Sequence, residues 1–219
     1  MKKLFSIFII AVLILSSAEC SLGNNEQEPS INDSAPESLG TAELKDSPTV
    51  SESTTDAQAK VLIAFFSCTG TTKQMAEYVG QSQKADFYEI IPEVPYTQSD
   101  LAYYTGGRAD QEQNDPTARP AINGMVENMA DYSVVFIGYP IWHGQAPKII
   151  YTFLESYDFS GKTVIPFCTS HSSGIGSSAT NLHTLAENAN WLDGKRFGAD
   201  ADFNETREWV DSFGLSETR

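Results

Sequence analysis

The hydroxyl-rich loop at 67–72 is the stretch of this chain where residue types and spacing most clearly suggest chemistry. An apolar run precedes it, a helical pattern follows it, and it consists of Ser67, Cys68, Thr69, Gly70, Thr71 and Thr72. Hydroxyls, a glycine that allows close backbone approach and the free N–H groups of a helix N-terminus make a cradle for a phosphate without a cation. The alternative is helix capping, for which one Ser or Thr would suffice. Four hydroxyls in six positions favour the anion site.

Sequence spacing excludes several other chemistries. The 67–72 loop lacks the G-x-x-x-x-G-K-[ST] pattern of nucleotide triphosphatases and the G-x-G-x-x-G pattern of dinucleotide-binding folds. A phosphatase nucleophile at Cys68 would require an arginine six positions later, where the chain has Gln74. A later loop at 169–178 lacks the G-x-S-x-G spacing of serine hydrolases, and His171 within it has no acidic partner that the sequence identifies. We also expect no metal site.

The elements that must position these loops follow from the hydrophobic pattern. Uninterrupted apolar runs are typical of strands covered on both faces, and we expect strands at 61–66, 86–91, 133–139 and 163–169. Helical patterns predict helices at 71–83, 122–129, 146–157, 177–188 and 204–213. This alternation indicates an α/β domain, in which ligands bind outside the carboxyl ends of the strands. Pro166 is the misfit, because a proline removes a ladder donor and usually marks an edge strand.

A strand followed by S-x-T-G-x-T and a helix resembles the phosphate loop of flavodoxins. The segments at 114–122, 138–147, 153–170 and 194–197 are similar to the same family in its short-chain form, so the resemblance covers about 60–215. It implies a flavodoxin-like open, doubly wound sheet of five parallel strands in the order 2-1-3-4-5, with helices on both faces. It also implies that FMN is the cofactor, with its phosphate on Ser67, Cys68, Thr69, Gly70, Thr71 and Thr72.

The same resemblance places the flavin ring between two further loops. The residues implied to line the ring are Pro140, Ile141, Trp142, His143 and Gly144 on one side and Thr169, Ser170, His171 and Gly174 on the other. Trp142, between a proline and a glycine, could supply the flat apolar surface that a flavin needs. Two roles are open for His143. It could face the N1 and O2 edge of the flavin and stabilise the reduced anion, or it could simply be solvated near a helix start. No catalytic group is assigned, and Trp142 and His143 are the candidates.

The charge of the chain narrows the classes of partner. The 219 residues include 14 Lys and Arg against 29 Asp and Glu, which gives a net charge of −15 and disfavours a nucleic-acid binder. The folded part, 60–219, has a net charge of −9, which suits docking to a basic redox partner. We expect electron transfer to a redox protein or a small-molecule acceptor. The alternatives are an FMN-dependent NAD(P)H:quinone-type oxidoreductase and a flavin-free phosphate-binding module.

The first 59 residues differ in composition from the rest. Lys2 and Lys3, an apolar run at 4–15 and Cys20 resemble a bacterial lipoprotein signal at 1–20, although Glu19 stands where that signal has a small residue. Ordinary cleavage after Ala18 is the alternative. Residues 21–59 have eight acidic groups against one lysine and no aromatic residue, as in a disordered tether. We therefore expect an exported protein, anchored through a lipid at Cys20 on the extracytoplasmic side of a membrane or secreted.

Two features of the folded part remain. The connection at 91–120 contains Tyr96, Tyr103 and Tyr104 and is too long for a plain loop, so we expect it to be functional or a lid. The flavodoxin resemblance places this segment beside the flavin pocket and leaves open whether any of its tyrosines covers the ring. Cys68 follows one expected strand and Cys168 lies in another, and the expected order separates these strands by one other strand, about 10 Å. That distance is beyond disulfide reach unless the loops bend together. We expect both to be free thiols.

Overall fold

The computed structural model describes residues 60–215, and the predicted signal segment and tether at 1–59 lie outside them. The strands are β1 (Val61–Phe65), β2 (Ala85–Glu89), β3 (Ile91–Pro92), β4 (Ile122–Asn123), β5 (Val134–Pro140), β6 (Thr163–Thr169), β7 (Asn190–Trp191) and β8 (Lys195–Phe197). The helices are α1 (Thr71–Ser82), α2 (Arg108–Asn114), α3 (Lys148–Glu155), α4 (Gly176–Thr180) and α5 (Phe203–Asp211), with 3-10 turns η1 (Met129–Asp131) and η2 (His183–Leu185). None of the helices in this range is long and apolar enough to cross a membrane.

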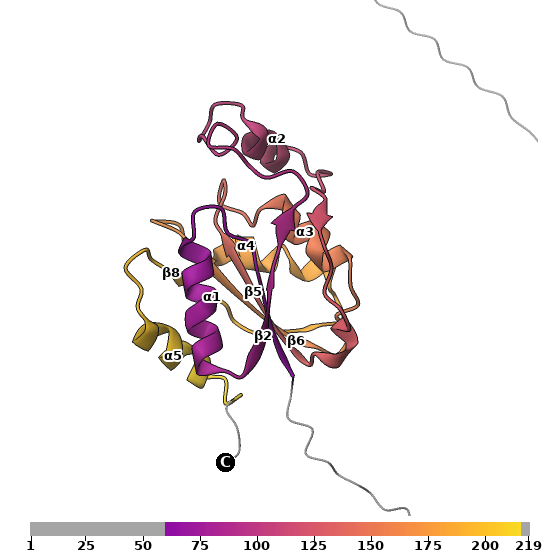
Figure 1. The fold of residues 1–219 in the computed structure, drawn as a ribbon, viewed down its shortest axis with the longest axis vertical. Coiled ribbons are helices and arrows are strands. Elements are labelled where there is room, and N and C mark those ends of the chain that lie inside the picture. The colour runs from indigo at the N-terminus through magenta and orange to yellow at the C-terminus, as the bar shows by residue number, and fades with distance from the viewer. Residues whose placement is uncertain (1–59, 216–219) are drawn as a thin grey trace, which may run out of the picture. The chain divides into compact units, whose positions relative to one another are not determined.

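The main sheet is parallel and has the order β2-β1-β5-β6-β7, with β8 also paired to β6 (Figure 1). Because β7 and β8 occupy one position in succession, the sheet has five strand positions in the order 2-1-3-4-5. This confirms the predicted α/β flavodoxin-like fold. The strands predicted at 61–66, 86–91, 133–139 and 163–169 all form, within one or two residues of the predicted bounds.

Two apolar cores lie on opposite faces of this sheet. Side chains alternate along β1, so that Leu62 and Ala64 enter one core and Val61, Ile63 and Phe65 the other. The first core is covered by α3 and η2. The second core is covered by α1 and α5, which lie on the other side of the sheet from α3 (Figure 1). Every residue of β1 is buried, which explains why its sequence is apolar without interruption.

Pro166 lies in β6, which is not an edge strand, although a proline within a sheet is usually found at an edge. Its effect is to interrupt the neighbouring strand. Strand β6 is paired on both sides, with β5 on one and with β7 and β8 on the other. Leu192 donates its N–H to the Val164 carbonyl at 3.0 Å, so the backbone polar groups of Val164, and of every second residue of β6 from there, point toward β7 and β8. Pro166 is the next residue on that side and has no N–H to donate. The neighbouring strand ends at Trp191 and resumes at Lys195, opposite this point. A Cβ at Gly194 would collide with the Pro166 carbonyl, so the chain requires glycine where it passes Pro166.

Two predicted helices are corrected by the structure. The helix predicted at 122–129 does not form, because Ile122–Asn123 pairs with β3 and both Gly124 (φ 88°) and Asn128 (φ 55°) are left-handed. The helix predicted at 177–188 is divided into α4 and η2. The Thr184 hydroxyl binds the Asn181 carbonyl at 3.2 Å and competes for an acceptor that a continuous helix would use.

Candidate functional site

Three loops meet at the carboxyl ends of β1, β5 and β6. The Ile141 N–H donates to the Thr169 carbonyl at 3.0 Å, joining the loop after β5 to the end of β6. The hydroxyls of Thr72 and Thr169 lie 2.7 Å apart and join the start of α1 to the same strand end. The Gln145 amide donates to the Ser177 hydroxyl at 3.3 Å. The loops that the sequence singled out are therefore in direct contact.

The hydroxyl loop leaves the start of α1 open. Gly70 is the N-cap residue, with φ 92°, and no side chain caps the helix. Ser67 instead accepts the Gly70 N–H at 3.1 Å, which leaves the proton of the Ser67 hydroxyl free to be donated. Nothing lies within 4 Å of where a Gly70 Cβ would be, so the space above this turn is open. Helix capping, the alternative weighed from the sequence, does not account for the hydroxyls.

Thr72 stands apart from the other hydroxyl residues of this loop. It is 1% exposed, and its hydroxyl is hydrogen bonded to that of Thr169, which is 6% exposed. Both side chains were predicted to contact the cofactor. In the structure these two hydroxyls are hydrogen bonded to each other, and this bond joins the two loops.

Neither cysteine of the described residues is in a disulfide. Although Cys68 is exposed as a residue, surrounding protein removes water from its sulfur and raises the pKa of the thiol to about 11. Cys168 is buried, and burial raises the pKa of its thiol to about 12. Because only a thiolate is an effective nucleophile, neither sulfur is prepared for nucleophilic chemistry.

The loop after β5 contains a tight turn. Trp142 and Gln145 exchange two backbone hydrogen bonds of 2.9 Å each. Between them His143 has φ 50° and Gly144 has φ 76°, and positive values at both central positions define a type I′ turn. The first of these positions is normally taken by Asn, Asp or Gly, so His143 requires support from outside the turn.

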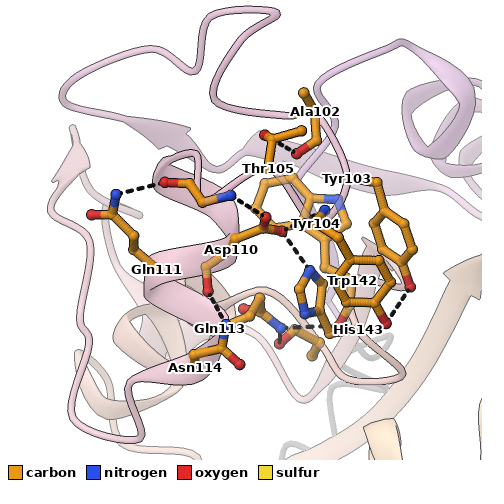
Figure 2. A network of polar contacts seen from close by, with 12 residues as sticks. Ala102, Tyr103, Tyr104, Thr105, Asp110, Gln111, Gln113, Asn114, Trp142 and His143 are labelled. Carbon is orange, nitrogen blue, oxygen red and sulfur yellow. Dashed lines mark hydrogen bonds and ion pairs between the residues drawn. The ribbon is translucent and has the colours of Figure 1, made fainter.

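That support comes from Asp110 on α2. The His143 Nε2 atom lies 2.7 Å from the Asp110 carboxylate, which also accepts the Gly106 N–H at 2.9 Å and the Tyr104 N–H at 3.3 Å (Figure 2). The Gly106 N–H, followed by His143, holds the pKa of the Asp110 carboxyl below its ordinary value against the opposing effect of burial. Tyr104 packs against the His143 ring at 4.9 Å. His143 is therefore held by a buried carboxylate and is not simply solvated.

Two further residues of the 91–120 segment attach it to the loop after β5. The Gln113 amide donates to the Trp142 and Ala146 carbonyls at 3.0 and 3.3 Å, and its oxygen accepts the Lys148 N–H at 3.1 Å. Tyr96 packs edge-on against Trp142, with ring centres 5.2 Å apart. Sequence reasoning missed Asp110 and Gln113. The only signal in the sequence was the unusual length of the segment that contains them.

Trp142 is partly buried at the junction of core and surface. The centre of its ring lies 5.4 Å from that of Phe66, with 81° between the ring planes, and Tyr96 also packs against it. Tyr96 donates its hydroxyl to Glu112, which also accepts the Arg108 Nε–H at 2.7 Å, and burial raises the pKa of Tyr96 well above its ordinary value. Of the three tyrosines considered from the sequence, Tyr96 packs beside Trp142, whereas Tyr103 and Tyr104 are 64% and 72% exposed.

The third loop follows β6 and presents exposed residues. Ser170 is half-buried, while His171 and Gly174 are exposed. The Ser170 N–H donates to the Phe197 carbonyl at 3.2 Å, and its hydroxyl accepts the Ser173 N–H at 2.9 Å. Within 60–215 no group of His, Cys, Asp and Glu is placed to hold a metal ion.

Comparison with known proteins identifies relatives of the whole domain. The model of a flavodoxin family matches residues 60–213. The chain is 45% identical to a proposed flavoprotein from Bacteroides eggerthii, with a TM-score of 0.68, covering 72% of this chain and 99% of that one. It is 40% identical to a proposed flavoprotein from Bacteroides uniformis, with a TM-score of 0.67, covering 70% and 98%.

A more distant structure shares the fold. A flavoprotein from Lactobacillus acidophilus, solved in complex with FMN, is 23% identical with a TM-score of 0.52, covering 69% of this chain and 98% of that one. No curated protein matches the chain.

Proposed function

The chain belongs to the flavodoxin family, and from this premise we propose that it binds FMN noncovalently at the three loops and exchanges electrons with a partner. The single observation that carries the proposal is the uncapped start of α1. Its free N–H groups, the positive end of its dipole and the unused donor of Ser67 are suited to a phosphate dianion. The sequence likewise predicts a phosphate site at this loop without a lysine or arginine.

The ring would lie between the turn at Trp142 and the loop after β6. Trp142 offers a partly exposed aromatic surface, and the contacts from α2 hold its turn rigid before any ligand arrives. A preformed site loses little entropy on binding, which favours affinity. When bound, FMN supplies the redox chemistry, and the protein contributes binding, orientation and the local electrostatics. The flavoprotein from Lactobacillus acidophilus, which shares the fold, was solved with FMN and supports this assignment.

A second candidate function is an NAD(P)H-dependent oxidoreductase with a planar acceptor such as a quinone. The observation that favours it is the exposed pair of Tyr103 and Tyr104, whose ring centres lie 4.0 Å apart and which both contact the His143 ring (Figure 2). Such a pair could stack a planar ring at the edge of the site. Steady-state oxidation of NAD(P)H with a quinone separates this function from a pure electron carrier, which requires a protein reductase.

We also propose that the chain is exported and works at the extracytoplasmic face of a membrane. The proposal rests on the composition of 1–59 alone, with Cys20 as the lipid-bearing residue. Incorporation of labelled fatty acid into the wild-type chain, and its loss in Cys20→Ala, would support the anchor. Secretion of an unlabelled protein shortened by its leader would show ordinary cleavage instead.

Titration of the purified chain with FMN tests the cofactor directly. Binding should quench flavin fluorescence and saturate at one FMN per chain. Phosphate binding without any flavin effect would favour the flavin-free module.

A further inference from the structure

Strand β8 brings an arginine to the third loop of the site. The break opposite Pro166 lets the chain rejoin β6 with Cys168 and Arg196 as register partners. Arg196 is half-buried, and its side chain reaches past the end of β6 to the loop that follows. The proposed cofactor-binding residues do not include it.

The Arg196 guanidinium binds two successive carbonyl groups of that loop. Its Nε and one terminal nitrogen donate to the Ser170 carbonyl at 3.1 and 2.9 Å. The same terminal nitrogen donates to the His171 carbonyl at 2.8 Å. A planar fork of donors fixes such an arrangement in a way that a lysine ammonium cannot.

These contacts determine where the N–H groups of the loop point. In a planar trans peptide, the carbonyl of one residue and the N–H of the next point in opposite directions. The N–H groups of His171 and Ser172 therefore point away from Arg196. Within the described residues, neither has a hydrogen-bond acceptor. Two adjacent free donors on an exposed loop are suited to a partially negative ligand atom.

Arg196 also carries an uncompensated charge. The other described arginines form ion pairs, namely Arg108–Glu112, Arg119–Glu155 and Arg207–Asp211. Among residues 60–215, Arg196 has no carboxylate within ion-pair distance, although the domain is strongly acidic. Its positive charge is thus available to a ligand at this loop.

We propose that Arg196 is a positioning residue for the flavin. It holds the 170–172 peptides so that two N–H groups face the polar edge of the ring, and its charge favours the electron-rich, reduced form of the cofactor. This inference rests on the proposed function, since it concerns the ring of the same FMN. Its consequence is that Arg196 raises both the affinity for FMN and the reduction potential.

Two substitutions at this position separate orientation from charge, and Arg207 supplies a matched control. Arg196→Met removes both contributions, so FMN should bind about tenfold more weakly or worse and the potential should fall. Arg196→Lys keeps the charge and loses the fork, so affinity should fall while the potential stays close to that of the wild type. Arg207→Met makes the same change of net charge on α5 and should alter neither quantity.

Amide hydrogen exchange of the cofactor-free chain gives a readout that does not depend on FMN. Arg196→Met should speed exchange of the Ser170 and Ser173 amides, which are hydrogen bonded in the ordered loop, and Arg207→Met should not. Unchanged exchange in Arg196→Met, or affinity and potential equal to those of Arg207→Met, would overturn the inference. If the wild-type chain binds no FMN, the proposed function fails, and the exchange result alone decides whether Arg196 positions the loop.

Discussion

The buried pair of Thr72 and Thr169 offers the sharpest test of how the loops are held together. Their hydroxyls are 2.7 Å apart, and the two residues are 1% and 6% exposed. Thr72→Val keeps the shape of the side chain, removes one partner and leaves the Thr169 hydroxyl buried without a hydrogen bond. We expect this to lower the free energy of unfolding by about 1 to 3 kcal/mol, the cost of an unsatisfied buried polar group.

The double substitution should cost less than the two single ones together. When Thr72 and Thr169 are both valine, no unsatisfied hydroxyl remains, and removal of both partners of a buried hydrogen bond is often nearly neutral. The predicted coupling energy between the sites is about 1 kcal/mol or more. At this domain size, each kcal/mol corresponds to a shift in Tm of about 2 to 4 °C.

Urea unfolding of the wild type, both single variants and the double variant measures this coupling. The same proteins should bind FMN with an affinity reduced less than in Ser67→Ala, because the Thr72 hydroxyl faces Thr169 and that of Ser67 faces the open loop. Additive changes, within about 0.3 kcal/mol, would refute the reasoning. A larger loss of FMN affinity in Thr72→Val than in Ser67→Ala would also refute it.

Three further predictions concern single groups. Asp110→Asn should lower Tm at pH 7. The pKa of Asp110 is lower in the folded chain than in the unfolded chain, where it is about 3.9. The Asp110 carboxylate therefore stabilises the fold above about pH 3.9, and this stabilisation is lost as the pH falls through the folded pKa. The stability of Asp110→Asn should lack this part of the pH dependence. His143→Asn, which places the preferred Asn-Gly pair in the turn, should fold with the turn intact but lack the Asp110 contact. Adding Asp110→Asn should then lower Tm by less than Asp110→Asn does in the wild type, because only the Gly106 and Tyr104 contacts of the carboxylate remain to be weakened. Cys68, with a pKa of about 11, should react with iodoacetamide at pH 8 about ten to a hundred times more slowly than free cysteine, which a timed mass-spectrometric assay would show.

The layered sheet was predictable because its signal is local. Continuous apolar runs such as β1 and β5 reflect strands buried on both faces, and the hydroxyl loop between β1 and α1 is contiguous in sequence. Pro166 was correctly recognised as unusual, but its effect depends on a partner strand some 25 residues later. The failed helix at 122–129 depends on the left-handed conformations of Gly124 and Asn128. The sequence pattern did not reveal them.

The contacts that support the site could not be predicted from the sequence, because they join residues that are far apart along the chain. Asp110 and Gln113 contact residues about 30 positions away, and Arg196 contacts a loop some 25 positions earlier. A single carboxylate, amide or guanidinium on a polar stretch carries no pattern that distinguishes it from a solvated side chain. The structure shows that Asp110 explains how His143, a residue left open from the sequence, occupies a left-handed turn position.

The visible absorption spectrum of the purified chain tests the central claim most directly. We predict a yellow protein with flavin bands, or a colourless one that acquires them with added FMN and releases FMN on denaturation. A folded chain that stays colourless after incubation with excess FMN and removal of the free flavin would contradict it.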